Sequence, residues 1–208
     1  MTISLSSFTT ARNPDGTYSL TLAQLTSVFL TEIETLLGPR DSKFTYVGLE
    51  IDETPNASPR IWFPHSGHPV REQGKRSEHV IIRLTEKAQT DANLAIWQLA
   101  HECVNLIDPW NIDAEGRPTN LLEEGLAAWY QHTIVHGIPL DPPYAEAKAL
   151  VDPHMPNLAT AIRHIRTDHK IRIGDIEDPD LLMRHCREMD SKIAENLCLR
   201  FSSTEEQS

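Results

Sequence analysis

Apolar side chains dominate residues 93–107, NLAIWQLAHECVNLI, the segment around which the chain is organised. They recur at helical spacing and leave only a narrow polar face, a pattern typical of a largely buried helix. We expect this helix to begin near Thr90 or Asp91, because both are good N-cap residues. It should end at Asp108, because Pro109 cannot continue a helix.

Helical spacing also predicts elements on both sides of this segment. Thr21 and Gln24 are spaced as a capping box at the start of a first helix, which Gly38 and Pro39 end. The second half of the chain is predicted to be helical from about residue 140, with a brief extended segment at residues 171–176. The helices expected after the central one cover residues 120–137, 143–151, 157–169 and 179–201.

Alternating polar and apolar positions predict strands in the first half of the chain. Over residues 44–51, the side chains of Thr45, Val47, Leu49 and Ile51 are expected to share one buried face. Two shorter strands are predicted over residues 61–63 and 79–84. Together with the helices, these strands predict an α+β fold with a small mixed sheet.

Composition and charge exclude some classes of function. The chain has 208 residues, enough for one domain with a sizeable core, and its net charge of -11 argues against binding to nucleic acid. The sequence contains no run of about eighteen apolar residues, so no membrane span is predicted. The polar start lacks the basic and then apolar segments of a secretion signal, so we expect a cytoplasmic protein. Cys103, Cys186 and Cys198 are odd in number and lack CxxC spacing, which predicts reduced thiols.

The polar face of the central helix carries residues suited to metal chemistry. His101 and Asn105 are four residues apart and therefore share a face, with Glu102 beside them. A helix of this design can offer a metal two ligands and a nearby general base. Asn105 is the difficulty, because a neutral amide oxygen is a poorer partner for zinc than an imidazole nitrogen.

A second helix with carboxylates is predicted from the sequence NLLEEGLAAW at residues 120–129. Asn120 is its predicted N-cap, and Glu123 is placed to complete a capping box with it. This leaves Glu124 as the carboxylate that is free to bind a metal. The alternative is that Glu124 is only a first-turn acid, favoured by the helix dipole.

His101 and Glu102, followed by Glu-Gly-Leu-Ala at residues 124–127, resemble the gluzincin metallopeptidases. The pattern of that family is His-Glu-x-x-His and then a second helix bearing a glutamate. The resemblance covers roughly the middle of the chain. It implies a zinc ion held by His101, Asn105 and Glu124, with Glu102 as the catalytic base that takes a proton from the attacking water.

The same resemblance implies one zincin-like domain over residues 1–208, with a helical C-terminal part from about residue 140. The polar residues 202–208 are expected to form a disordered tail. In the zincin fold the strand before the motif helix is commonly an edge that pairs with an extended peptide. The strand at residues 79–84, HVIIRL, is therefore expected to be either such an edge or an ordinary interior strand, and the substrate or ligand to be a peptide or protein.

Three interpretations of this pattern are open. The first is an active zinc peptide hydrolase, in which Asn105 is a weak ligand or another histidine completes the site. The second is a catalytically degenerate scaffold that has lost its metal and acts as a binding or regulatory module. The third is an accidental match. The sequence does not predict a particular substrate or an oligomeric state.

Several other polar residues have weaker claims to a metal role. Asp108 lies about 10 Å along the helix from His101, too far to share one metal, and is predicted to be a turn residue. The histidines considered as further ligands, cleft residues or donors over the site are His65, His68, His132, His136, His154, His164, His169 and His185. Ordinary solvated or hydrogen-bonded positions are favoured for the first four. One of the last four could lie over the site as a donor, and the sequence does not choose among them.

Overall fold

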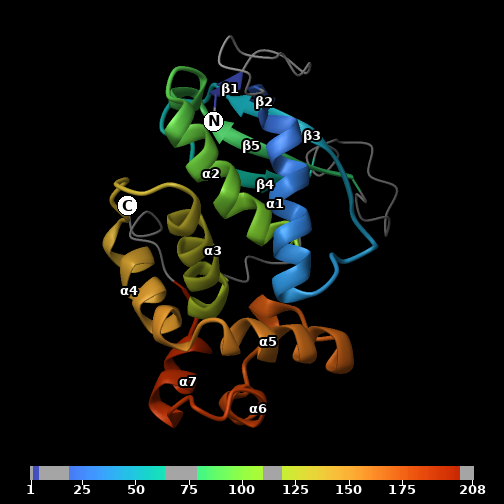
Figure 1. Cartoon of the computed structure of the whole chain (residues 1–208), viewed down its shortest axis with the longest axis vertical. Coiled ribbons are helices and arrows are strands. Elements are labelled where there is room, and N and C mark those ends of the chain that lie inside the picture. Colours follow the sequence, from blue (N-terminus) through green and yellow to red (C-terminus); the bar gives the residue numbers. More distant parts are fainter. Residues whose placement is uncertain (1, 5–18, 64–78, 110–118, 202–208) are drawn as a thin grey trace.

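The protein has an α+β fold in the computed structural model, which describes residues 2–4, 19–63, 79–109 and 119–201 (Figure 1). The strands and helices α1 and α2 occupy one end of the molecule, and α5, α6 and α7 gather at the other end. The helices are α1 (Leu22–Leu37), α2 (Ala92–Asn105), α3 (Leu121–Ile134), α4 (Pro142–Val151), α5 (Asn157–His164), α6 (Pro179–His185) and α7 (Ser191–Leu197). The strands are β1 (Thr2–Ser4), β2 (Ser19–Thr21), β3 (Thr45–Asp52), β4 (Arg60–Trp62) and β5 (His79–Thr85).

Helix α1 begins at the predicted capping box. The Gln24 N–H donates to Thr21 Oγ1 (3.2 Å), and the Thr21 N–H donates to Gln24 Oε1 (2.9 Å). Two backbone donors that a helix start leaves without partners are thereby satisfied. The helix ends at Gly38, whose φ of 93° lies in a region that favours glycine.

The three-stranded sheet is small and mixed, as predicted. Its order is β3-β5-β4, with β3 parallel and β4 antiparallel to β5. The expectation that HVIIRL at residues 79–84 forms an edge is wrong, because β5 is the central strand and both of its sides are paired. Its Val80, Ile82 and Leu84 are fully buried, so the interior-strand alternative holds.

Strand β3 departs from the predicted alternation. Val47 was expected on the buried face but is 52% exposed. The register with β5 shifts between Tyr46 and Gly48, so one extra residue interrupts the ladder. Such a β-bulge reverses which side chains face the core, and here Tyr46, Leu49 and Ile51 pack against it.

Helix α2 starts where its cap residue predicts and ends earlier than expected. The Leu94 N–H donates to Asp91 Oδ1 (3.0 Å), which makes Asp91 the N-cap. The helix ends at Asn105, three residues before the predicted end, and a turn leads to Asp108. Asp108 is therefore a turn residue as predicted, but it is also buried.

Helix α3 is capped by Asn120, whose Oδ1 accepts from the Glu123 N–H (2.9 Å). Only this half of the predicted capping box forms between the two residues. Glu123 Oε2 instead lies over Gly174, where an added β-carbon would be 2.6 Å from it. Glu123 and Glu124 therefore have different surroundings, as expected. The cause is the contact of Glu123 with Gly174 rather than a capping box.

Helices α3 and α4 approach each other closely at Gly125. A β-carbon on Gly125 would lie 2.6 Å from the Ala147 carbonyl oxygen and 2.7 Å from Val151 Cγ2. Real β-carbons do not come this close to backbone atoms, so only glycine allows this helix packing. Gly125 therefore has a structural reason to follow Glu124, independent of any family pattern.

The C-terminal part is helical but more broken than predicted. The single helix expected over residues 179–201 is wrong, because α6 ends at His185 and α7 starts at Ser191. Asp190 caps the second piece, with its Oδ1 accepting from the Lys192 N–H (2.8 Å). The helix expected over residues 157–169 is α5 followed by a π-helical turn, Ile165–His169.

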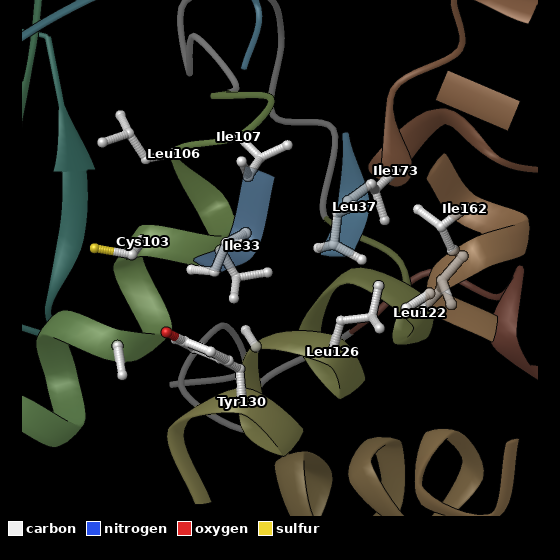
Figure 2. Packing of buried hydrophobic residues seen from close by; sticks show 14 of the residues in the cluster. Ile33, Leu37, Cys103, Leu106, Ile107, Leu122, Leu126, Tyr130, Ile162 and Ile173 are labelled. Atoms are coloured by element: carbon white, nitrogen blue, oxygen red, sulfur yellow. The ribbon is translucent and has the colours of Figure 1, made fainter. Parts of the chain in front are cut away.

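The core joins helices from all parts of the described chain (Figure 2). Tyr130 of α3 meets Phe29 of α1 edge-on, with ring centroids 5.9 Å apart, and its hydroxyl donates to Glu32 Oε2 (2.7 Å). Around them lie Ile33, Leu37, Cys103, Ile107, Leu122, Leu126, Ile162 and Ile173. Among the described residues, no helix is long and apolar enough to cross a membrane.

Candidate functional site

Helices α2 and α3 bring the predicted site residues together. His101 Nε2 lies 3.3 Å from Glu124 Oε2, and both side chains are largely buried. Glu102 and Asn105 follow His101 on α2, and Asn105 Nδ2 makes a long hydrogen bond to Glu102 Oε2 (3.5 Å). The two helices therefore place His101 and Glu124 face to face, as two ligands of one ion would be.

The His101 ring is held in place from two sides. Its Nδ1 lies 3.1 Å from Gln131 Oε1, and its ring meets Tyr144 of α4 edge-on, with centroids 5.7 Å apart. Because an amide oxygen can only accept, Nδ1 must carry a hydrogen and donate it. In the neutral ring, Nε2 then presents a lone pair to Glu124, and a proton or another cation is needed between them.

The charges of the site residues shift one another's pKa values. Burial alone would lower the pKa of His101, but the Glu124 carboxylate, aided by Glu102 and Gln131, raises it to about 9. Burial raises the pKa of Glu102 to about 7; the nearby Glu124 adds to this, while His101 and Asn105 oppose it. The motif glutamate is consequently poised to exchange a proton near neutral pH.

Two buried oxygen atoms in the site accept no hydrogen bond from the described residues. They are Asn105 Oδ1 and Glu124 Oε2, the latter lying within ion-pair distance of His101 without hydrogen-bond geometry. The other Glu124 oxygen, Oε1, accepts from the Thr119 hydroxyl (2.6 Å). Buried acceptors without donors cost free energy, so these two oxygens are the acceptors of the site that the described residues leave unsatisfied.

Two of the side chains, His101 and Glu124, could donate to one divalent metal ion. Two ligand atoms bound at about 2.1 Å to a tetrahedral zinc lie roughly 3.4 Å apart, close to the 3.3 Å between His101 Nε2 and Glu124 Oε2. Gln131 would hold the outer nitrogen of His101, as outer-shell partners of metal-bound histidines do. The third donor would be the amide of Asn105; in the described part of the chain, no three His, Cys, Asp or Glu side chains converge on one point.

Four residues that support the site were not singled out from the sequence. Gln131 orients His101, Thr119 holds Glu124, Tyr144 contacts the His101 ring, and the Arg60 charge helps to lower the pKa of Glu102. Gln131 carried a usable signal, because it lies seven residues after Glu124 and so on the same helix face. The other three come from elements whose placement depends on tertiary packing.

The structure leaves other candidate residues outside this cluster. Asp108 pairs with Arg166, and its Oδ2 accepts from Arg166 Nε (2.6 Å). Burial lowers the pKa of His132, and the nearby charges of Lys148 and His136 lower it further. The histidines at positions 65 and 68 lie outside the described residues.

Neighbouring acidic and thiol groups are buried beside the site without joining it. Burial, with the charges of Glu124 and Asp108, raises the pKa of Glu123 to about 8. Burial also raises the pKa of Cys103, which points into the core (Figure 2). Its thiol therefore stays protonated and is a weak nucleophile near neutral pH.

Comparisons with protein-family models, curated proteins and solved structures found no match to this chain.

Proposed function

We propose that the protein is a zincin-like, metal-dependent peptide hydrolase. The observation that carries the proposal is the 3.3 Å contact of His101 Nε2 with Glu124 Oε2 across α2 and α3. In this proposal His101, Glu124 and, more weakly, Asn105 hold a zinc ion, and Glu102 is the catalytic base. The unpartnered Asn105 Oδ1 supports the third ligand role, because a bound cation would satisfy it.

The side chains of the site would divide the work as follows. A bound zinc ion supplies a water of lowered pKa and polarises the carbonyl that is attacked. Glu102 would act as the base that takes a proton from the attacking water, for which its pKa of about 7 is suitable. Gln131 keeps the His101 ring in the tautomer that leaves Nε2 free to bind the metal.

A peptide substrate would pair along β4 rather than β5. Of the described strands in this sheet, β4 and β3 form the edges, and an edge strand can add an extended peptide through backbone hydrogen bonds. The choice of β4 is supported by Arg60 on this strand, whose charge is one of the influences that lower the pKa of Glu102 against the effect of burial. The expectation of peptide pairing therefore moves from residues 79–84 to residues 60–62.

The second candidate function is a degenerate zincin-like scaffold that binds peptides or proteins without metal. It is favoured by the bond from Asn105 Nδ2 to Glu102 Oε2, which occupies the base with a protein donor. The positive charge of a protonated His101 would then balance the Glu124 carboxylate, and no metal would be needed. The two candidates differ in one measurable property, the affinity of the wild-type protein for zinc.

The test is zinc binding by isothermal titration calorimetry, after elemental analysis of the protein purified without added zinc. The hydrolase proposal predicts about one zinc per chain, lost in Glu124→Gln, and peptide cleavage that Glu102→Gln abolishes. Asn105→His should strengthen zinc binding by about tenfold or more, because it replaces an amide by an imidazole. Asn93→His is the matched control, since Asn93 is exposed on the same helix.

Each result decides between the alternatives. Absence of zinc from the wild type, together with binding by Asn105→His, would replace the hydrolase by the degenerate scaffold. If Asn105→His binds zinc no better than Asn93→His, the two helices do not form a gluzincin site and the resemblance is accidental. Zinc binding without peptide cleavage would leave the metal site and overturn the hydrolase.

A further inference from the structure

Three histidines gather on the surface where α5, the following π-helical turn and α6 meet. We name His164, His169 and His185 the histidine cluster. His169 Nε2 lies 3.3 Å from His185 Nε2, and the His164 and His185 ring centroids are 6.3 Å apart. His164 and His169 lie on one continuous helical stretch, and the packing of α6 brings His185 to them.

The separation of the two ring nitrogens is suited to a shared ion. Two imidazole nitrogens bound at about 2.0 Å to one tetrahedral zinc lie roughly 3.3 Å apart. Without an ion, the His169 and His185 nitrogens can approach this closely only if one of them carries a hydrogen and the other accepts it. Two protonated rings would repel each other in this arrangement.

The histidine cluster is accessible from solvent. His164 and His169 are exposed, and His185 is partly exposed. A neutral imidazole is the form that binds metals, and it is the preferred ligand of zinc, copper and nickel.

We propose that His169 and His185 form a surface site for a divalent transition-metal ion of the zinc and copper class. These two rings are the only protein donors of the proposed site; the His164 ring lies beside His185, with centroids 6.3 Å apart, and is not a ligand. Water would complete the coordination, so the site should bind more weakly than a structural site with four protein ligands. The site shares no residue with the His101 and Glu124 pair and does not depend on the proposed hydrolase function.

The experiment is a titration of the full chain with Cu²⁺ alone, followed by electron paramagnetic resonance and calorimetry near neutral pH. The wild type should bind one ion with a nitrogen-coordinated spectrum. Loss of even an outer-shell partner costs about 10- to 100-fold in metal affinity, so His169→Gln and His185→Gln should each weaken binding at least that much. His136→Gln, which removes an exposed histidine elsewhere, should leave the affinity unchanged.

All titrations are repeated in Glu124→Gln, which separates this site from the candidate site on α2 and α3. Retained binding in Glu124→Gln, with loss in His169→Gln and His185→Gln, supports the proposal. Equal affinities for the wild type, His169→Gln and His185→Gln would overturn it and leave His169 and His185 as a hydrogen-bonded pair. Circular dichroism checks that the variants fold; both replaced side chains lie at the surface.

Discussion

Two buried acid–base pairs among the described residues differ in how completely their polar atoms are hydrogen-bonded. Asp108 and Arg166 form a two-pronged contact, with Arg166 Nε and Nη2 donating to the two carboxylate oxygens (2.6 and 2.7 Å). His101 and Glu124 make one contact of 3.3 Å without hydrogen-bond geometry. Both pairs connect segments that are distant in the chain.

The remaining donors and acceptors make the contrast larger. Arg166 also donates to the carbonyl oxygens of Leu37 and Pro39, and the Ile173 N–H donates to Asp108 Oδ2 (3.2 Å). In the other pair, Glu124 Oε2 accepts no hydrogen bond from a described residue. A saturated buried pair holds the fold, whereas an unsaturated one retains affinity for a proton or metal. This difference distinguishes a structural pair from a candidate functional one.

The largest expected effect comes from breaking the saturated pair. Arg166→Met should lower the free energy of unfolding by about 3–5 kcal/mol, because it leaves Asp108 buried and unpaired. Urea unfolding followed by circular dichroism measures the loss. Arg163→Met is the control, since Arg163 is exposed and makes one hydrogen bond, to the Thr35 carbonyl oxygen (3.1 Å). Equal losses in both variants would remove the distinction between the two pairs.

Local sequence rules predicted the elements of the fold better than their tertiary partners. The capping box at Thr21 and the N-caps Asp91 and Asn120 depend on neighbouring residues, and all of them form. Arg166 could not be predicted as the partner of Asp108, because 58 positions separate them. The bulge in β3 was missed for the same reason, since it exists only relative to β5.

The candidate site, like the fold, was predictable only where it depends on residues close together in the chain. Helical spacing placed His101, Glu102 and Asn105 on one helix, and the cap at Asn120 left Glu124 free; the structure then brings Glu124 to His101. The side chains that hold the site, such as Thr119 and Tyr144, depend on how the helices pack. Sequence alone also could not show that Gly125 is required by the approach of α4.

The second prediction disturbs the helix of Glu124 while leaving the saturated pair intact. Gly125→Ala forces a methyl group against the Ala147 carbonyl oxygen, which a β-carbon would meet at 2.6 Å. Overpacking of this kind should lower the free energy of unfolding by about 1–3 kcal/mol, measured by urea unfolding. Thr133→Ala, an exposed position on the same helix, should cost less than about 1 kcal/mol. A neutral Gly125→Ala would show that α3 and α4 are not in close contact.

The smallest expected effect is a pH dependence that belongs to the unsaturated pair. The folded pKa of His101, about 9, exceeds its ordinary value of 6.5. The stability gained from the charged ring is therefore complete below pH 6.5 and is lost as pH rises through about 9. Glu102 and Glu123 also have raised pKa values, about 7 and about 8, so they too bind protons more tightly when folded and add to the loss.

The measurement is the melting temperature between pH 6.5 and 9, with a chelator present to keep metals out. The wild type should become less stable across this range, and Glu124→Gln should flatten the dependence, because it removes the main group that raises the pKa of His101. Glu146→Gln, at an exposed position on α4, should keep the wild-type slope. If Glu124→Gln and Glu146→Gln give the same slope as the wild type, the His101 and Glu124 pair carries no proton-linked stability. In that case the contrast with the saturated pair would rest on geometry alone.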